Sequence, residues 1–201
     1  MTPTLLYVYD PMCSWCWGFR SSWVALKQAL PNELALEHIS GGLAPDCDEP
    51  MPEEMQREIE GYWHTIAEQL GTQFNFDFWR LNKPRRSTYM ACRASIAATF
   101  QNAQEAMIDA IQRSYYLRAL NPSDTPILLQ LASELALDVP LFERDLLSPQ
   151  TQKELERQLI LARALPINGF PSLVLSVDER LLPIECDYHK IEGMLAQIRD
   201  G

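Results

Sequence analysis

Residues 5–19 of this 201-residue chain read Leu-Leu-Tyr-Val-Tyr-Asp-Pro-Met-Cys-Ser-Trp-Cys-Trp-Gly-Phe. The first five residues are aliphatic or aromatic, which is typical of a short strand buried on both faces. Asp10-Pro11 ends this strand, and apolar residues then recur at helical spacing as far as Pro31. The sequence therefore predicts a strand that passes through a tight turn into a helix, and the helix should begin at or just after Cys13.

A second predicted strand follows this helix. Residues 34–39 read Leu-Ala-Leu-Glu-His-Ile, and Gly41-Gly42 closes the segment. Two strands joined by a helix of about four turns make a βαβ unit, whose strands should be parallel and whose crossover should be right-handed.

The middle of the chain is predicted to be almost entirely helical, from Glu53 to about Leu165. Apolar residues recur at helical spacing along this region. Thr125-Pro126 and Ser148-Pro149 have the cap and early proline that are typical of helix starts. Three alternating phenylalanines fit either a short extended segment or an aromatic loop packed on the core, namely Phe74, Phe76 and Phe78.

Strand patterns return only near the C-terminus. Residues 170–177 are predicted to form a strand, Asp178-Glu179 a turn, and residues 180–185 an antiparallel partner strand. Asp187 is expected to cap a last amphipathic helix.

The predicted order of elements is β-α-β, a helical insertion, and β-β-α. We therefore expect an α/β fold in which residues 1–50 and 166–201 form one domain and residues 51–165 form a large all-helical insertion. A chain of this length can bury roughly 70% of the surface that it exposes when unfolded. Its core therefore needs neither a metal nor a disulfide to hold it together.

The charge balance narrows the range of partners. The chain carries 17 Lys and Arg against 27 Asp and Glu, a formal net charge of −10. Such a chain repels phosphate backbones and anionic membrane surfaces, so we expect no nucleic-acid or membrane partner. No apolar run approaches the ~20 residues of a spanning helix, and the first run lacks the features of an export signal. We expect a cytoplasmic protein.

Cys13-Ser14-Trp15-Cys16 is the only close pair among five cysteines. A Cys-x-x-Cys pair can be half of a zinc site, an accident of core packing, or a dithiol–disulfide centre. A zinc site needs two more ligands at compatible spacing, whereas Cys47, Cys92 and His64 are scattered along the chain, so we predict no metal site. The odd number and irregular spacing of the cysteines also argue against a disulfide framework.

The position of the pair favours a redox centre. Free backbone N–H groups and the positive end of the helix dipole at a helix N-terminus stabilise a Cys13 thiolate. Cys13 is then expected to be the exposed nucleophile that attacks a substrate disulfide. Cys16, one turn inside the helix, is expected to be the buried, protonated thiol that resolves the mixed disulfide. Ser14 and Trp15 are expected to tune the reduction potential.

Residues 10–19 resemble the active-site segment of the DsbA-like branch of the thioredoxin superfamily, in particular its cytosolic members that are predicted protein-disulfide isomerases. Three further segments extend the resemblance. Residues 40–43 (Ser-Gly-Gly-Leu) resemble the loop after that family's second strand, residues 87–98 a helix of its inserted domain, and residues 169–173 the segment that holds its cis-proline. The resemblance implies a thioredoxin-like fold with a mixed central sheet and the activity of a thiol–disulfide oxidoreductase or isomerase.

The resemblance also implies a substrate site. In this family a cis-proline lies over the active disulfide and leaves the backbone of the preceding residue free to pair with an extended substrate. Pro171 and Phe170 take these positions here, and Ser14 and Trp15 complete the expected substrate-binding set. No cofactor is implied beyond the redox-active disulfide. The expected partners are protein or small-molecule thiols and disulfides, with glutathione as a candidate co-substrate.

The other cysteines and the basic loop give weaker indications. We expect Cys92 and Cys186 to be buried and inert, and Cys47 to lie in an exposed acidic loop. Residues 83–86 (Lys-Pro-Arg-Arg) are expected to be solvated, and would hold a glutathione carboxylate if they approached the cleft. The three histidines are expected to be structural, namely His38, His64 and His189.

Two other classes of function fit the same architecture. Glutathione-dependent isomerases and transferases resembling hydroxychromene-carboxylate isomerase commonly place Ser at the nucleophile position and lack the resolving thiol. The presence of both Cys13 and Cys16 disfavours that class. The remaining alternative is a non-catalytic interaction domain, in which the helical insertion binds a partner and the cysteine pair is vestigial.

Overall fold

A computed structural model describes residues 2–201, and it confirms the predicted α/β fold with a helical insertion. The sheet and the helices nearest to it are β1 (Thr4–Tyr9), α1 (Ser14–Ala29), β2 (Ala35–Ser40), β3 (Ser172–Val177), β4 (Arg180–Ile184) and α9 (Glu192–Asp200). The helices between β2 and β3 are α2 (Glu53–Leu70), α3 (Asp77–Leu81), α4 (Tyr89–Ala97), the 3-10 helix η1 (Ala98–Gln101), α5 (Gln104–Arg118), α6 (Thr125–Glu134), α7 (Val139–Leu146) and α8 (Pro149–Ala164).

The central sheet is mixed and has the strand order β2-β1-β3-β4. β1 and β2 are parallel, with Thr4 opposite Ala35, as expected for strands joined by a crossover helix. β3 runs antiparallel to β1 and forms a hairpin with β4. The predicted turn, Asp178-Glu179, closes this hairpin, and both of its residues have positive φ, as type I′ hairpin turns require.

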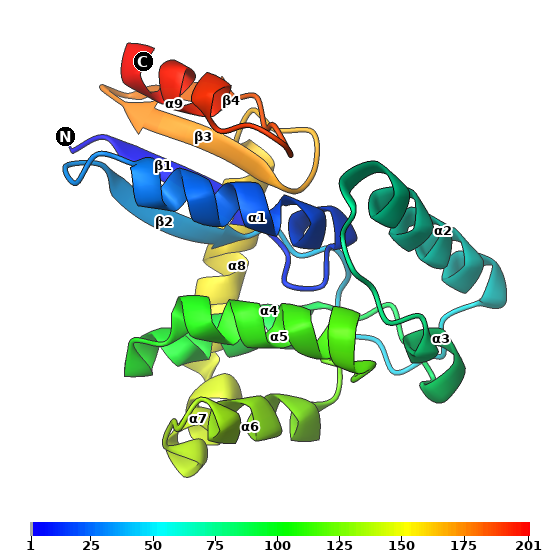
Figure 1. Cartoon of the computed structure of the whole chain (residues 1–201). Coiled ribbons are helices and arrows are strands. Elements are labelled where there is room, and N and C mark those ends of the chain that lie inside the picture. The colour runs from blue at the N-terminus through cyan, green and yellow to red at the C-terminus, as the bar shows by residue number, and fades with distance from the viewer. Residues whose placement is uncertain (1) are drawn as a thin grey trace.

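Helices cover both faces of the sheet (Figure 1). Side chains alternate along β1, so that Leu5 and Tyr7 pack with α1 and α9, whereas Leu6 and Val8 pack against the end of α8 on the other face. This arrangement confirms that β1 is buried on both faces. Because α8 also packs against α4, it links the sheet to the helical region, and the exact domain boundary stays a prediction.

The helical region has its own apolar core around Trp63. The three alternating phenylalanines contribute to this core from a loop and the short helix α3, not from an extended strand. Helix α7 was not assigned from the sequence, because it is short. Asp138 caps it by accepting a hydrogen bond from Leu141 N at 3.0 Å.

The predicted cap of the last helix is wrong. The N-cap position of α9 is Ile191, whereas the Asp187 carboxylate accepts hydrogen bonds from His189 N and Lys190 N. These two bonds form a turn that ends before the helix begins. Among residues 2–201, no helix combines the length and apolar character needed to cross a membrane.

Candidate functional site

The cysteine pair lies where the sequence places it, at the N-terminus of α1. Cys13 is the N-cap residue, and its sulfur accepts a hydrogen bond from Cys16 N at 3.4 Å. The turn before it is closed by a hydrogen bond from Cys13 N to Asp10 O at 3.0 Å. The sulfur of Cys13 therefore faces the unpaired N–H groups of the helix, an environment that stabilises negative charge.

The prediction that Cys13 is exposed is wrong. Its exposed fraction is 6%, and that of Cys16 is 0%. The reason is tertiary packing, since Phe170, Leu43 and Trp15 join the same apolar cluster as the two cysteines. The order of burial is nevertheless the predicted one, because Cys16 is the more deeply buried of the pair.

A segment 157 residues away in the sequence meets the cysteine pair. The Cys13 thiol donates to the Phe170 carbonyl oxygen at 3.6 Å, and the Phe170–Pro171 peptide bond is cis. The structure therefore brings together Cys13, Phe170 and Pro171, as the resemblance implied.

The loop after β2 packs against the Phe170 ring. A Cβ atom on Gly41 would come within 2.1 Å of the Phe170 ring, so only glycine leaves room for the ring there. Gly42 has a φ of +65°, which glycine adopts without strain. The Gly41-Gly42 pair therefore does more than end β2, because Gly41 makes room for the Phe170 ring beside Cys13.

Asp10 is a site residue that the sequence analysis missed. Its carboxylate is fully buried and accepts hydrogen bonds at 2.7 Å from Met12 N, Leu43 N and Thr88 Oγ1. It thereby ties the turn before Cys13 to the Gly41-Gly42 loop and to α4. Burial raises the pKa of Asp10, against the opposing effect of these hydrogen bonds. An acidic residue directly between a buried strand and a Cys-x-x-Cys pair was the available signal.

Cys16 has the environment expected of a protonated thiol. Burial raises the pKa of Cys16 well above that of a free thiol, and the neighbouring Cys13 raises it further. Burial also raises the pKa of Cys92, and it raises that of Cys186 to about 11.

Other predicted substrate-binding residues lie around the pair. Ser14 and Trp15 are half-buried, and the Trp15 ring makes an edge-on contact with Tyr188, with 5.6 Å between ring centroids. A cavity of about 560 Å³ opens beside Trp15 and Tyr188. Cys186 also lines this cavity, and its thiol lies 4.0 Å from the Pro171 carbonyl oxygen. It is half-buried, so the prediction of a buried thiol is wrong for Cys186.

The structure also places the other cysteines, the basic loop and two of the histidines. Cys92 is buried and Cys47 exposed, as expected. Arg85 is not available to a glutathione carboxylate, because it is bound to Ser123 O and the Asp124 carboxylate. His38 packs edge-on against three aromatic rings and His64 stacks on Phe76, which agrees with structural roles. Residues 2–201 contain no group of three or more His, Cys, Asp or Glu that could hold a metal ion.

Comparisons with known proteins agree with this geometry. The family model described as Thioredoxin matches residues 6–185. A putative protein disulfide isomerase from Nitrosomonas europaea is 25% identical, with a TM-score of 0.86 over 100% of this chain and 97% of that one. The cytosolic disulfide reductase DsbM from Pseudomonas aeruginosa is also 25% identical, with a TM-score of 0.78 over 98% and 95% of the two chains. DsbM has also been solved with GSH.

Two curated relatives are named as adapter proteins and not as disulfide isomerases or reductases. The ClpXP adapter protein SpxH from Bacillus subtilis is 26% identical over 175 residues, which are 85% of this chain. The match covers only 58% of the adapter's length, and 64% of a second SpxH, from Halalkalibacterium halodurans. The chain thus spans less than two thirds of the curated relatives that it matches.

Proposed function

Because the chain belongs to the thioredoxin family, in its DsbA-like branch, we propose that it is a thiol–disulfide oxidoreductase or isomerase with Cys13-Ser14-Trp15-Cys16 as its redox centre. One observation carries this proposal. The sulfur of Cys13 lies at the N-terminus of α1 and 3.6 Å from the carbonyl oxygen that precedes the cis peptide bond. A sulfur in this place faces the free N–H groups of a helix and has a neighbouring backbone that can hold a substrate chain.

The reaction proceeds by two exchanges. The Cys13 thiolate attacks one sulfur of a substrate disulfide, a Cys13–substrate disulfide forms, and the other substrate sulfur leaves as a thiolate that takes up a proton. Cys16 then loses its proton and attacks the Cys13 sulfur, which releases the second substrate sulfur. The substrate gains two electrons and becomes a dithiol, and the Cys13–Cys16 pair becomes a disulfide.

The substrate binds over Cys13, where Trp15 lines one neighbouring cavity and Phe170 and Pro171 line another. The Phe170 carbonyl, which accepts from the Cys13 thiol, turns to accept from a backbone N–H of the substrate. Since Cys13 is only 6% exposed, the apolar side chains packed around it have to move to admit a substrate sulfur. Ser14, next to Cys13 in the sequence, and Pro171 complete the proposed substrate-binding set.

Glutathione is the proposed electron donor. Two glutathione molecules reduce the Cys13–Cys16 disulfide through a mixed disulfide at Cys13, and they leave as oxidised glutathione. The structure of the related reductase DsbM with GSH supports this choice. Such a cycle belongs in a reducing compartment such as the cytoplasm.

The test is reduction of insulin by glutathione, followed with three single variants. Cys13→Ser should lose all activity over background. Cys16→Ser should lose turnover and accumulate a mixed disulfide with glutathione that mass spectrometry detects. Cys47→Ser is the matched control, because its thiol is exposed in a loop and bonded to neither cysteine. Full activity of Cys13→Ser would refute the proposal, and full activity of Cys16→Ser on glutathione conjugates would favour an isomerase or transferase.

A second candidate function is that of an adapter, and the likeness to SpxH favours it. In this role the helical region between β2 and β3 binds a partner protein, and the cysteine pair is not needed. The discriminating experiment is degradation of a Spx-type substrate by ClpXP with the Cys13→Ser, Cys16→Ser double variant. Stimulation equal to that of the wild type supports an adapter, and no stimulation by either protein refutes it.

A further inference from the structure

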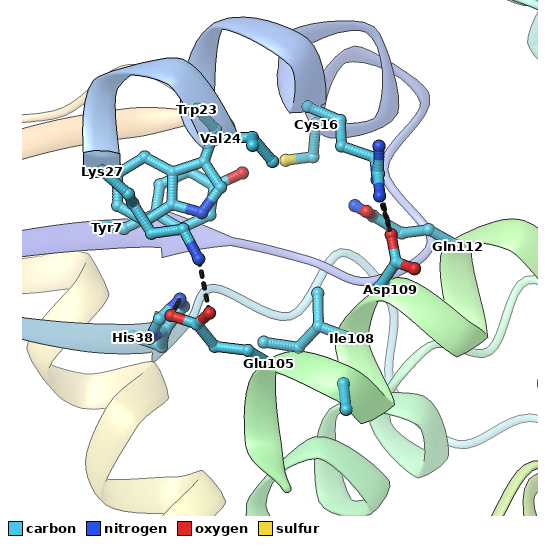
Figure 2. Close-up of a pocket in the computed structure, with 12 residues that line it drawn as sticks. Tyr7, Cys16, Trp23, Val24, Lys27, His38, Glu105, Ile108, Asp109 and Gln112 are labelled. Carbon is cyan, nitrogen blue, oxygen red and sulfur yellow. Dashed lines mark hydrogen bonds and ion pairs between the residues drawn. The ribbon is translucent and has the colours of Figure 1, made fainter. Parts of the chain in front are cut away.

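A second cavity, of about 290 Å³, lies at the seam between α1 and α5. Figure 2 shows Trp23 and Lys27 on α1 facing Glu105 and Ile108 on α5, with the Cys16 sulfur directed toward the same space. The volume is at the lower end of the range of ligand pockets, about 300–1,000 Å³. A single amino acid or a dipeptide is the size of molecule that fits it.

Two polar side chains that line this cavity make no side-chain hydrogen bond to another group of residues 2–201. His38 has an exposed fraction of 8% and Gln112 of 4%, and both line the cavity. The Glu105 carboxylate lies 3.8 Å from the Nε2 atom of His38. Because these two polar groups are not engaged in hydrogen bonds and face the cavity, both are available to a polar ligand there.

The charges around the cavity balance. Lys27 pairs with Glu105, and Arg20 pairs with Asp109. Burial lowers the pKa of His38 to about 4, which leaves this ring neutral at pH 7. An anionic or a cationic ligand would leave one member of an ion pair uncompensated, whereas a ligand with one charge of each sign would not.

The two ion pairs differ in how easily they open. Asp109 is held by two arginines, because Arg113 also donates to it at 2.6 Å. Glu105 is half exposed and pairs with Lys27, and its other neighbour, His38, is neutral at pH 7. Exposed pairs of this kind are worth about 0–1 kcal/mol, so the Lys27–Glu105 pair is the one that can exchange partners with a ligand.

The remaining wall of the cavity is apolar. Tyr7, Trp23, Val24 and Ile108 form it, and the Tyr7 and Trp23 rings are stacked with 4.1 Å between their centroids. A ligand for this space therefore needs an apolar body as well as its two charges.

We propose that this cavity binds a small zwitterion of the apolar amino-acid or dipeptide class. The ligand carboxylate pairs with Lys27, the ligand ammonium pairs with Glu105, and its apolar side chain lies against Trp23 and Val24. His38 and Gln112 supply hydrogen bonds to its polar atoms. The site does not depend on the redox chemistry proposed for Cys13, although Cys16 forms part of its wall.

The test is isothermal titration of the reduced full-length chain with L-phenylalanine, L-leucine and leucyl-glycine. We expect saturable binding of at least one of them, with a dissociation constant of about 10 µM to 1 mM. The methyl ester and the N-acetyl form of the same compound should bind at least about tenfold more weakly, because each lacks one charge. Equal binding of the ester, or no binding up to about 10 mM of any of the three, would overturn the proposal.

Variants locate the site. Val24→Trp should fill the cavity and abolish binding, and Val24 is 37% exposed, so the larger ring can be accommodated without unfolding. Lys27→Met should weaken binding at least about tenfold, whereas Lys153→Met, an exposed lysine on α8, should leave it unchanged. Retained binding by Val24→Trp and Lys27→Met would show that the ligand sits elsewhere.

Discussion

The sulfurs of Cys13 and Cys16 lie in regions that are built in different ways. Around Cys13 the protein uses backbone groups, namely the Phe170 carbonyl, the N–H groups of α1 and a glycine loop. The cavity that Cys16 lines has instead charged and polar side chains from α1, β2 and α5. A site of backbone groups depends on chain conformation, so substitutions that displace the backbone or the packed rings should have large effects on it. A site of side-chain charges is adjustable, so single substitutions should have smaller effects.

The largest effect is expected from Asp10, whose carboxylate holds the backbone around Cys13 in place. Asp10→Ala leaves the buried Met12 N–H, the part-buried Leu43 N–H and the Thr88 hydroxyl without their 2.7 Å acceptor. We expect unfolding in urea to show a loss of about 4 kcal/mol. The matched control is Asp187→Ala, because this exposed carboxylate also accepts from two backbone N–H groups. A loss as large for Asp187→Ala would show that burial is not the cause.

A substitution at Gly41 tests whether exchange at Cys13 depends on the position of the Phe170 ring. Gly41→Val would push the Phe170 ring away, since even a Cβ atom comes within 2.1 Å of it. We expect thiol–disulfide exchange to slow by about 100-fold, equivalent to about 2.7 kcal/mol. Gly61→Ala is the control, because nothing lies within 4 Å of its Cβ position in α2. It should stabilise the chain by roughly 0.5–1 kcal/mol and leave exchange unchanged. An unaltered exchange rate in Gly41→Val would show that the position of the Phe170 ring does not matter for thiol–disulfide exchange.

His38 gives the cavity lined by Cys16 a pH dependence. Burial lowers the pKa of His38 to about 4, and the nearby Glu105 and Lys27 act in opposite directions. Because folding favours the neutral ring, the contribution of His38 to stability is complete above about pH 6.5 and is lost as the pH falls toward 4. The aromatic rings of Tyr7, Tyr9 and Trp23 pack edge-on against its ring, and the Glu105 carboxylate lies 3.8 Å from its Nε2 atom.

The measurement compares wild type and His38→Phe by urea unfolding at about pH 7 and about pH 4.5. The wild type should lose roughly 2 kcal/mol more than the variant between these pH values, allowing for partial contact of His38 with solvent. Equal losses would mean that His38 is protonated as readily in the folded chain as in the unfolded one.

The smallest effect is expected at Glu105. Glu105→Gln removes a pairing with Lys27 that is half exposed to solvent. The free energy of unfolding should fall by less than about 1 kcal/mol, and the difference should shrink further in about 1 M salt. A loss as large as that of Asp10→Ala would contradict the contrast between the two regions.

Much of the fold could be predicted from local patterns. The run Leu5 to Tyr9 indicates a strand, and Ser148-Pro149 indicates a helix start, because neighbouring residues alone set these preferences. The Cys-x-x-Cys pair and its place at a helix N-terminus could be predicted in the same way. The cap of α9 could not, because Asp187 can form a turn of its own as readily as a helix cap.

The amino-acid sequence is enough to specify the order of elements, the cysteine pair and the acidic character of this protein, since these follow from adjacent residues and composition. Folding in three dimensions sets the low exposure of Cys13, the role of Asp10, and the pairing of Lys27 with Glu105. Burial, hydrogen bonding and charge pairing here join residues that lie 33 to 157 positions apart. No local pattern contains that information, because only the packed chain brings these groups together.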